Sequence, residues 1–383
     1  MKTFKGLIFS FLLISIPLSA KANSVNPWAV PAGLYLKGIG PIYGVGAGLS
    51  NLTGEQGNLT AFKTFEDVDV YGFLISDIPL GINGLSLNVG YAKADKFELE
   101  TNYARALNES TIFKQELKGE GNLFSLNYAL FNKKLNLNYT LINSHVEFVD
   151  YRTKDGDLIP FSKAALHDIN SDISSFSIST TAFKDDHNQI DLKGSITSTK
   201  GRLAQSDIRN YHYQAKYKRS LSPSIDVALY THLNHVSITK ASNSAAVNGN
   251  CSQNINNPYI YSQCLELQED VTEFIDQSNK YGTATPLGGS TGLRSYREFR
   301  FRSANNALSS AELRYNFNYH LPLQAVSFFE LGHANDQLSQ LYKKSVYSAG
   351  LGLRAFVKDI PLRLEAATGN EGESVFLTAG LPF

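Results

Sequence analysis

The amino-acid sequence predicts an all-β fold, a sixteen-stranded antiparallel transmembrane β-barrel. Three observations support this prediction. The chain begins with a leader typical of exported proteins, its strands alternate apolar and polar residues over about ten positions or more, and its connections alternate between short and long. A content of 20 Tyr and 23 Phe also fits a barrel, whose apolar band is flanked by girdles of aromatic residues.

The leader, residues 1–22, has the features of a cleaved signal peptide. Lysines precede an apolar run over residues 6–18, and Ala20-Lys21-Ala22 supplies small residues at a cleavage site. A membrane-anchoring helix is the alternative, but the run is too short and the cleavage site follows at once. The predicted domains are therefore a signal peptide at 1–22 and a barrel domain at 23–383. No other segment approaches the roughly 18 continuous apolar residues of a membrane helix.

Period-2 alternation is the main signal in the mature chain, and residues 211–218 (Tyr-His-Tyr-Gln-Ala-Lys-Tyr-Lys) illustrate it. One face of such a strand suits lipid, and the other, with charges in mid-strand, suits a polar lumen. A soluble β-sandwich would give similar but shorter strands with a different spacing. In chain order, the predicted strands are 29–39, 41–50, 58–67, 68–79, 85–97, 122–131, 135–152, 173–184, 189–199, 208–221, 224–239, 306–321, 325–335, 345–358, 361–369 and 374–383.

The connections between these strands separate by length. Tight turns lie at one end of the predicted barrel: 80–84, 132–134, 185–188, 222–223 and 322–324. Mostly longer loops lie at the other end: 98–121, 153–172, 200–207, 240–305 and 336–344. Short periplasmic turns and longer external loops are the rule in bacterial barrels, and an even number of strands places both chain ends in the periplasm.

The last predicted strand ends the chain on an aromatic residue. Val375, Leu377, Ala379 and Leu381 alternate along its outward face, and Phe383 is terminal. This pattern resembles the targeting signature that the barrel-assembly machinery reads on outer-membrane proteins. The alternative is an ordinary buried edge strand with a chance phenylalanine. We therefore expect a bacterial outer-membrane location, with contacts to outer-membrane lipid and lipopolysaccharide and to the assembly machinery during biogenesis.

Charge, cysteine content and motifs exclude several functions. With 35 basic and 35 acidic residues the formal net charge is zero, which argues against a nucleic-acid partner. Cys251 and Cys264 are the two cysteines, and in an exported chain they predict one local disulfide. A metal site is the weaker alternative, because no further cysteine or histidine cluster lies nearby. We predict no cofactor and no enzymatic activity, since no nucleophile with its partners is evident; a membrane-embedded enzyme remains a minor alternative.

The longest loop, residues 240–305, contains the sequence "GGSTGLRSYREFRFR". It combines two adjacent glycines, Gly288 and Gly289, with four arginines. The simpler interpretation is a basic external loop that binds lipopolysaccharide phosphates. The alternative is that this sixth external loop folds into the lumen, where its arginines pair with carboxylates of the wall. Glu312 and Glu330 are the candidates, because a carboxylate facing lipid at mid-strand would be costly.

This loop also resembles a known motif. The sixth loop of the BamA-type outer-membrane assembly and translocation superfamily carries Gly-Gly-Ser-x-x-(Val/Leu)-Arg-Gly-(Phe/Tyr). Leu293, Arg294 and Tyr296 match this motif, while Ser295 replaces the usual glycine after the arginine. The resemblance implies that Arg294 contacts an acidic residue of strand 13 and a glutamate of strand 12. By position these are Glu330, in place of the more usual Asp, and Glu312. The glycine pattern near residue 44 and the closing strands also resemble this barrel.

The resemblance implies a function. The superfamily includes the barrel-assembly insertase and two-partner secretion transporters, so we expect a barrel that moves or inserts a polypeptide, or lipid, through the lumen or between the first and last strands. We expect no periplasmic POTRA domain, since only about six residues separate the cleavage site from the first strand. The alternative is a passive pore or structural barrel. The cargo, the oligomeric state and the roles of Arg297, Arg300 and Arg302 stay open.

Overall fold

The computed structural model describes residues 25–53, 56–162, 169–201, 206–242, 247–317, 322–357 and 360–380. The predicted signal peptide at 1–22 lies outside the described residues. Leu381 and Phe383 of the predicted targeting strand also lie outside them.

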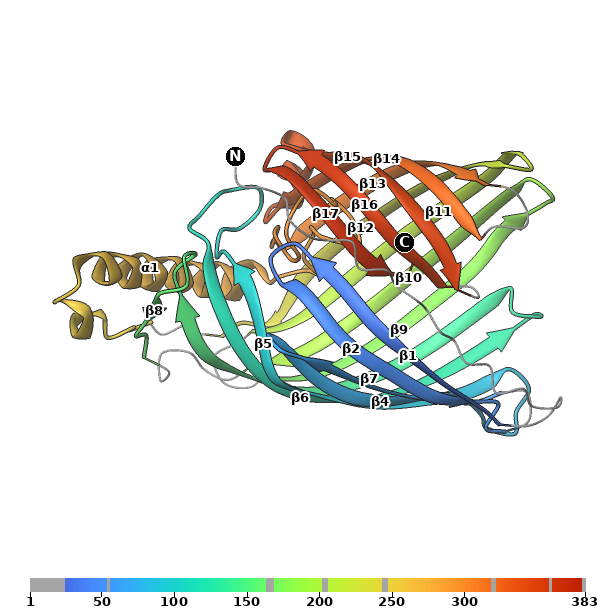
Figure 1. Ribbon diagram of the computed structural model, residues 1–383, viewed down its shortest axis with the longest axis horizontal. Helices are drawn as coiled ribbons and strands as arrows, with labels where there is room; N and C mark the ends of the chain where they lie inside the picture. The colour runs from blue at the N-terminus through green and yellow to red at the C-terminus, as the bar shows by residue number, and fades with distance from the viewer. Residues whose placement is uncertain are drawn as a thin grey trace.

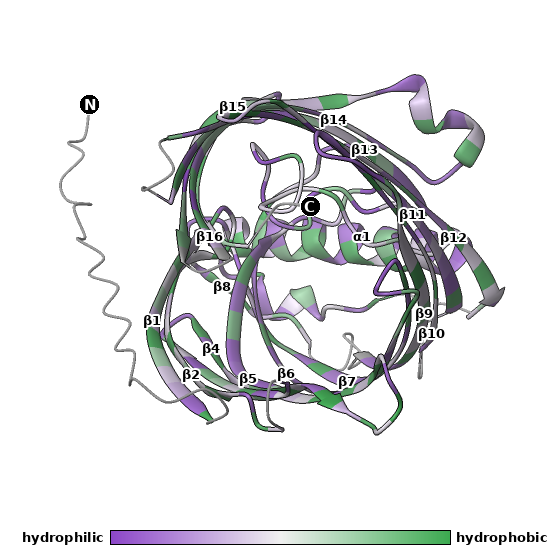
Figure 2. Cartoon of the chain, turned by 90° about the vertical axis from the view of Figure 1, so that its right-hand side faces the viewer, coloured by the Kyte–Doolittle hydropathy of each residue, from purple (hydrophilic) through white to green (hydrophobic). Residues whose placement is uncertain are grey.

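Sixteen of the described strands form one closed antiparallel barrel, which confirms the predicted fold class. Each barrel strand pairs with its neighbour in the chain, and β1 pairs with β17 to close the ring (Figure 1). Viewed along the barrel axis, the strands form a ring around the lumen (Figure 2). They are β1 (Asn26–Leu36), β2 (Gly40–Ser50), β3 (Asn58–Phe65), β4 (Val68–Pro79), β5 (Leu85–Thr101), β6 (Phe113–Leu130), β7 (Leu135–Arg152), β9 (Ile169–Lys184), β10 (Asn188–Gly201), β11 (Asp207–Ser222), β12 (Ile225–Lys240), β13 (Asn305–Asn316), β14 (Leu323–Asn335), β15 (Val346–Val357), β16 (Ile360–Gly369) and β17 (Gly372–Ala379).

The two faces of the closing strands differ as the period-2 pattern predicts. Leu353 and Leu364 are more than half exposed, at 56% and 51%, on an apolar face. Their sequence neighbours Arg354 and Glu365 are almost completely buried on the opposite face. Successive side chains of a strand point to opposite faces, so each strand presents leucines on one side and charges on the other. In β17, Val375 and Ala379 are exposed and Leu377 is half-buried on one shared face.

The predicted loop at 98–121 is shorter in the structure. Strand β5 continues to Thr101, and β6 begins at Phe113 rather than at residue 122. The added part of β6 pairs with both β5 and β7, through Leu117 for example. Glycines at 119 and 121 and several charges give this stretch little strand pattern in the sequence, so the strand boundary was predicted too late.

The predicted loop at 240–305 is not a loop throughout, because it contains a helix of 24 residues. Helix α1 (Pro258–Tyr281) begins at Asn257, whose side chain accepts a hydrogen bond from Ile260 N at 3.2 Å. Proline at the first helical position favours the start, and Gly282, with φ 80°, ends the helix. None of the helices in the described residues is both long and apolar enough to span a membrane.

Helix α1 packs on the extended ends of β6 and β7. Its buried residues Cys264, Leu267 and Val271 recur at helical spacing, which places them on one face. They meet Phe113 of β6 and Tyr151 of β7 in one buried hydrophobic cluster. The short strand β8 (Leu158–Ile159) pairs with the end of β7 and adds to the same cluster. Figure 1 shows α1 lying beyond the ends of the barrel strands, beside β5, β6 and β8.

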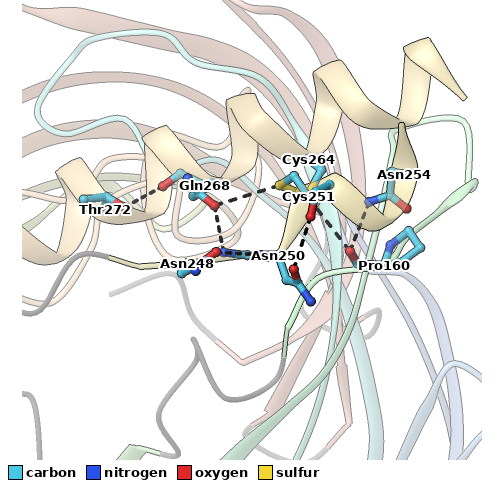
Figure 3. The surroundings of a disulfide bond; sticks show 10 residues. Pro160, Asn248, Asn250, Cys251, Asn254, Cys264, Gln268 and Thr272 are labelled. Carbon is cyan, nitrogen blue, oxygen red and sulfur yellow. Dashed lines mark hydrogen bonds between the residues drawn. A yellow bond between two sulfur atoms is a disulfide. The ribbon is translucent and has the colours of Figure 1, made fainter. Parts of the chain in front are cut away.

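Cys251 and Cys264 form a disulfide that ties the short helix η2 (Cys251–Asn254) to α1 (Figure 3). The sulfurs are buried. Asn254 Nδ2 donates to Pro160 O at 3.2 Å, and Gly249 N donates to Gln268 Oε1 at 2.8 Å. The disulfide therefore holds the segment before α1 against the β7–β9 connection.

Replacing Cys251 and Cys264 by serine is expected to loosen this segment without unfolding the barrel. A cross-link that closes a loop of this length stabilises the folded state by about 3 kcal/mol in the chain-entropy account. Limited proteolysis should cut between residues 247 and 257 faster than in the wild type, while the heat-modifiable mobility of the barrel stays the same. Ser252→Ala with Ser262→Ala is the matched control, because both serines are exposed. Unchanged proteolysis in the cysteine variant would contradict the expectation.

Candidate functional site at the Arg294 cluster

The segment 284–303, which we call the hairpin loop, is folded by its own backbone contacts. Leu287 and Phe301 exchange two hydrogen bonds, at 3.0 and 2.9 Å, which close the loop at its base. Gly292 N donates to Gly289 O at 3.2 Å, and Tyr296 N donates to Leu293 O at 3.0 Å. Leu293 has φ 59°, an uncommon value for a leucine. These turns place Arg294 at the far end of the hairpin loop.

Gly288 and Gly289 are required by this geometry. Both have positive φ, 108° and 98°, which side-chain-bearing residues rarely adopt. A Cβ at Gly289 would lie 2.2 Å from the carboxylate of Glu298. That carboxylate is nearly buried and accepts a hydrogen bond from Ser290 N at 2.6 Å. Burial raises the pKa of the Glu298 carboxyl, and the hydrogen bond from the Ser290 backbone opposes this.

Arg294 is completely buried and contacts three carboxylates. Its backbone N donates to Glu330 Oε2 at 2.8 Å, and its Nε donates to Glu330 Oε1 at 2.9 Å. Its Nη1 lies 3.0 Å from Glu365 Oε2 and 3.0 Å from Glu312 Oε1. The guanidinium carbon lies 3.4 Å from the centre of the Phe328 ring. Hydrogen bonds to ionised partners are stronger than neutral ones, so one side chain joins strands β13, β14 and β16.

Three more arginines surround the same carboxylates. Arg354 donates to Glu312 at 2.7 Å and to Glu365 at 2.9 Å. Arg363 donates to Glu365 at 3.1 Å, and Arg314 lies 2.6 Å from Glu312. We call these seven residues the Arg294 cluster: Arg294, Arg314, Arg354, Arg363, Glu312, Glu330 and Glu365. Four arginines and three glutamates give it a formal charge of +1.

The structure therefore brings the predicted residues Arg294, Glu312 and Glu330 together. Four further members of the cluster were not predicted to pair with them: Arg314, Arg354, Arg363 and Glu365. Each is a charged residue in a strand, with an apolar or aromatic residue on one or both sides. The argument that singled out Glu312 and Glu330, the cost of a lipid-facing charge, would have placed them on the inward face, but it would not have shown that they lie beside Arg294.

The apolar members of the motif hold the hairpin loop to the wall. Leu293 is fully buried, and a Cβ on Gly332 of β14 would lie 2.4 Å from its side chain. Tyr296 is also fully buried, and its hydroxyl donates to Asn370 Oδ1 at 3.0 Å. The glycine at 332 therefore leaves the space that Leu293 fills. Charge pairing and apolar packing fix the same end of the loop.

The other three arginines of the loop contact protein groups. Arg300 lies 2.6 Å from Glu371, in the turn between β16 and β17. Arg297 lies 3.7 Å from Glu100 of β5. Arg302 donates to Thr101 Oγ1 at 3.1 Å and to the backbone oxygen of Asn102. These contacts attach the hairpin loop to both β5 and the β16–β17 turn.

The carboxylates of the cluster are engaged by arginines and are not arranged to bind a metal ion. The oxygens of its three glutamates accept from arginines, which leaves no free carboxylate for a metal ion. Elsewhere in the described part of the chain, no group of three or more His, Cys, Asp or Glu side chains is placed to hold one. The geometry suits a structural or mechanical role, in which one loop is held to several strands.

Comparison with solved structures agrees on the fold. CdiB from Escherichia coli matches with a TM-score of 0.59 and 12% identity, over 94% of this chain and 63% of CdiB. CdiB from Acinetobacter baumannii gives 0.52 and 12%, over 94% and 59%. BamA from Haemophilus ducreyi lacking POTRA domains 1–3 gives 0.50 and 12%, over 94% and 70%. The barrel has the BamA-type fold. No protein-family model and no curated protein sequence matches the chain.

At 12% identity this likeness concerns the fold alone, and the chain spans less than two thirds of either CdiB. A BamA-type barrel with one apolar and one polar face is an outer-membrane β-barrel. This bears out the fold and the class of membrane protein that the sequence predicts.

Among the described residues, this barrel has its fewest paired residues between β1 and β17, a boundary that we call the seam. Only one residue pair, Tyr35 with Leu377, is in register there among the described residues. Strand β1 pairs with β2 through eleven residue pairs, and β16 with β17 through eight. Lys37, just after β1, donates to Ser295 O of the hairpin loop at 2.8 Å and to Glu373 O of β17 at 3.1 Å. One end of the seam is therefore joined through the hairpin loop.

Proposed function

We propose that this outer-membrane barrel moves or inserts a polypeptide, or lipid, through its lumen or through the seam between β1 and β17. The single register pair at Tyr35 and Leu377 is the observation that carries the proposal. A boundary with few ladder hydrogen bonds costs less free energy to open than its neighbours. Pro31, within β1, has no N–H to donate and weakens pairing further. The resemblance of "GGSTGLRSYR" to the sixth-loop motif supports the same class of function.

The proposal includes a place for the hairpin loop. We propose that it folds into the lumen, where the Arg294 cluster anchors it to the wall. The contacts of Arg294 with β13, β14 and β16 support this, because the buried charges lie on the face opposite the exposed leucines. A loop held in this way would narrow the lumen at rest. Outer-membrane lipid and lipopolysaccharide would contact the apolar face, and the barrel-assembly machinery would bind the chain during biogenesis.

A disulfide across the seam is expected to block the activity. Tyr35→Cys with Leu377→Cys joins the one registered pair of β1 and β17. In proteoliposomes, the unmodified barrel should speed insertion of an unfolded eight-stranded outer-membrane protein, measured by heat-modifiable mobility. The oxidised variant should lose this acceleration, and a reductant should restore it.

The matched control cross-links a hairpin that opening would leave intact. Leu34→Cys with Ile42→Cys joins a registered pair within the β1–β2 hairpin. This variant should stay active when oxidised, and the wild type with reductant controls for loss of the native disulfide. An oxidised seam variant that is as active as this control would exclude opening at the seam.

Conductance separates the proposal from a passive pore. In planar bilayers, a barrel narrowed by an anchored loop should be mostly closed, with brief openings. A large and constant conductance would instead support a pore or structural barrel without translocase activity. We also propose that the protein is not an enzyme; hydrolysis of lipid by the purified barrel would contradict this.

A further inference from the structure

A cavity of about 330 Å³ lies between the hairpin loop and the polar faces of β10, β11 and β12. It is separate from the Arg294 cluster, none of whose members lines it. Its wall is formed by Asn210, His212, Tyr230, His232 and Asn234 together with residues 285–288, 291 and 292 of the hairpin loop. The volume lies at the small end of the range of about 300–1,000 Å³ that is typical of ligand sites. We call it the histidine cavity.

The lining of the histidine cavity is polar but lacks formal charge. Among the described residues that form it, there is no Lys, Arg, Asp or Glu. The polar side chains come from alternate positions of three neighbouring strands, which places them on one face. Leu287 and Leu308 add apolar surface, and Tyr230 and the two histidines add aromatic rings. A charged ligand would enter without a counter-charge, which is costly in a partly desolvated site.

A chain of hydrogen bonds sets the tautomer of His212. The Thr285 backbone oxygen accepts from Asn306 Nδ2 at 2.7 Å, so Asn306 presents its Oδ1 to Asn234 Nδ2, at 2.8 Å. Asn234 then presents its own Oδ1 to His212 Nδ1, at 2.7 Å. A backbone carbonyl can only accept, and this fixes the direction of every amide in the chain. Neutral His212 therefore carries its proton on Nδ1 and has an acceptor at Nε2, which makes only a long contact, 3.4 Å, with the side-chain amide of Gln214.

Two other atoms of the lining are buried and unpaired in the part of the chain that the structure describes. Among the described residues, His232 Nε2 and Asn210 Oδ1 are buried without a hydrogen bond. His232 Nδ1 lies 2.9 Å from the Tyr230 hydroxyl, and Asn210 Nδ2 lies 3.5 Å from Thr285 Oγ1, so each side chain is held by its other polar atom. Buried polar atoms in native proteins nearly always have partners, so these two atoms are available to bind a water or a ligand.

We propose that the histidine cavity binds a neutral sugar of about one or two rings. Sugar hydroxyls can donate to acceptors such as His212 Nε2 and Asn210 Oδ1, and they can accept from neighbouring hydroxyl groups. The apolar and aromatic residues suit the C–H face of a sugar ring. The uncharged lining favours neutral sugars over uronic acids and phosphosugars. This inference does not depend on the proposed translocation function.

Equilibrium dialysis with radiolabelled glucose and maltose tests the proposal. The barrel is purified in an amine-oxide detergent, because detergents with sugar headgroups would compete for the site. We expect saturable binding of at least one sugar, with a dissociation constant on the order of 1 mM and about one site per barrel. His212→Phe should weaken binding by about ten-fold or more, since it removes the acceptor at Nε2 and keeps a ring.

A matched histidine controls for general effects of the substitution. His145 of β7 is bound to Asn170 Oδ1 at 2.9 Å, as His212 is to Asn234, but it does not line the cavity. His145→Phe should leave binding unchanged, and heat-modifiable mobility checks that each variant is folded. Glucuronate should bind at least ten-fold more weakly than glucose. The proposal is overturned if neither sugar binds saturably, which would mean that the cavity holds only water. It is also overturned if His212→Phe binds sugar as tightly as the wild type does, or if glucuronate binds as tightly as glucose.

Discussion

Arg294→Ala is expected to destabilise the barrel more than any other single change in the Arg294 cluster. Glu330 is fully buried, and Arg294 is the one cation within salt-bridge distance of it in the described part of the chain. Removing one partner of a buried ion pair leaves an uncompensated charge, which costs about 3–5 kcal/mol. Glu312 and Glu365 keep Arg354, so the main loss falls on Glu330. The hairpin loop also loses its link between β13, β14 and β16.

The measurement is urea unfolding followed by heat-modifiable mobility, together with trypsin digestion of the folded barrel. The variant should unfold at lower urea, and trypsin should cut the hairpin loop. Arg219→Ala is the control, because Arg219 is an exposed arginine on β11. An Arg294→Ala barrel with the urea midpoint and trypsin resistance of this control would exclude a stabilising role for the pair.

A double variant shows whether the destabilisation comes from the unpaired charge of Glu330 or from lost packing. Arg294→Met with Glu330→Gln removes both charges and keeps an unbranched side chain over the Phe328 ring. Replacing both members of a buried pair by neutral groups is far less costly than removing one. The double variant should therefore be more stable than Arg294→Ala. If it is no more stable, the loss comes from packing around Leu293 and Tyr296.

The barrel could be predicted from the sequence because the alternation of apolar and polar residues within each strand indicates its lipid-facing and inward-facing sides. Alternation at period 2 is local, so it survives without any knowledge of which strands pair. The first part of β6, residues 113–121, was not predicted as strand. Glycines and charged residues interrupt the alternation there, where the strand extends to meet α1. Helix α1 was missed although its signals were present: Asn257 and Pro258 at the start, Gly282 at the end, and apolar residues at helical spacing between them.

The candidate site was only partly predictable, for a reason of register. Glu312 and Glu330 lie on neighbouring strands, and the motif resemblance points to both. Glu365 lies two strands further on, and it reaches Arg294 only because β15 pairs Gly352 with it and sets its depth. Pairing register is a non-local property that sequence alternation does not determine. The sequence therefore shows that a strand carries a charge on its inward face. It does not show which charges of other strands lie at the same depth along the barrel axis.

Gly289→Ala is expected to cause the second large loss of stability. Backbone strain and a steric clash both arise at this one position. The residue has φ 98°, and an alanine there strains the backbone by about 1–2 kcal/mol. Its Cβ would also lie 2.2 Å from the Glu298 carboxylate, which must move and release Ser290 N. A buried donor left without its acceptor costs a further 1–3 kcal/mol or so. Trypsin should then cut after Arg297, Arg300 or Arg302, and the urea midpoint should fall.

The chain offers a glycine that separates these two costs. Gly81, in the turn between β4 and β5, has φ 79°, and a Cβ there would meet nothing within 4 Å. Gly81→Ala carries the backbone strain alone, so it should shift the urea midpoint less and leave the hairpin loop resistant to trypsin. Adding Glu298→Ala to Gly289→Ala removes the group that the new Cβ strikes, and trypsin resistance should partly return. If Gly289→Ala behaves as Gly81→Ala does, the contact with Glu298 does not hold the hairpin loop. The loop would then depend on its other contacts with the barrel, among them those of Arg294, Leu293 and Tyr296.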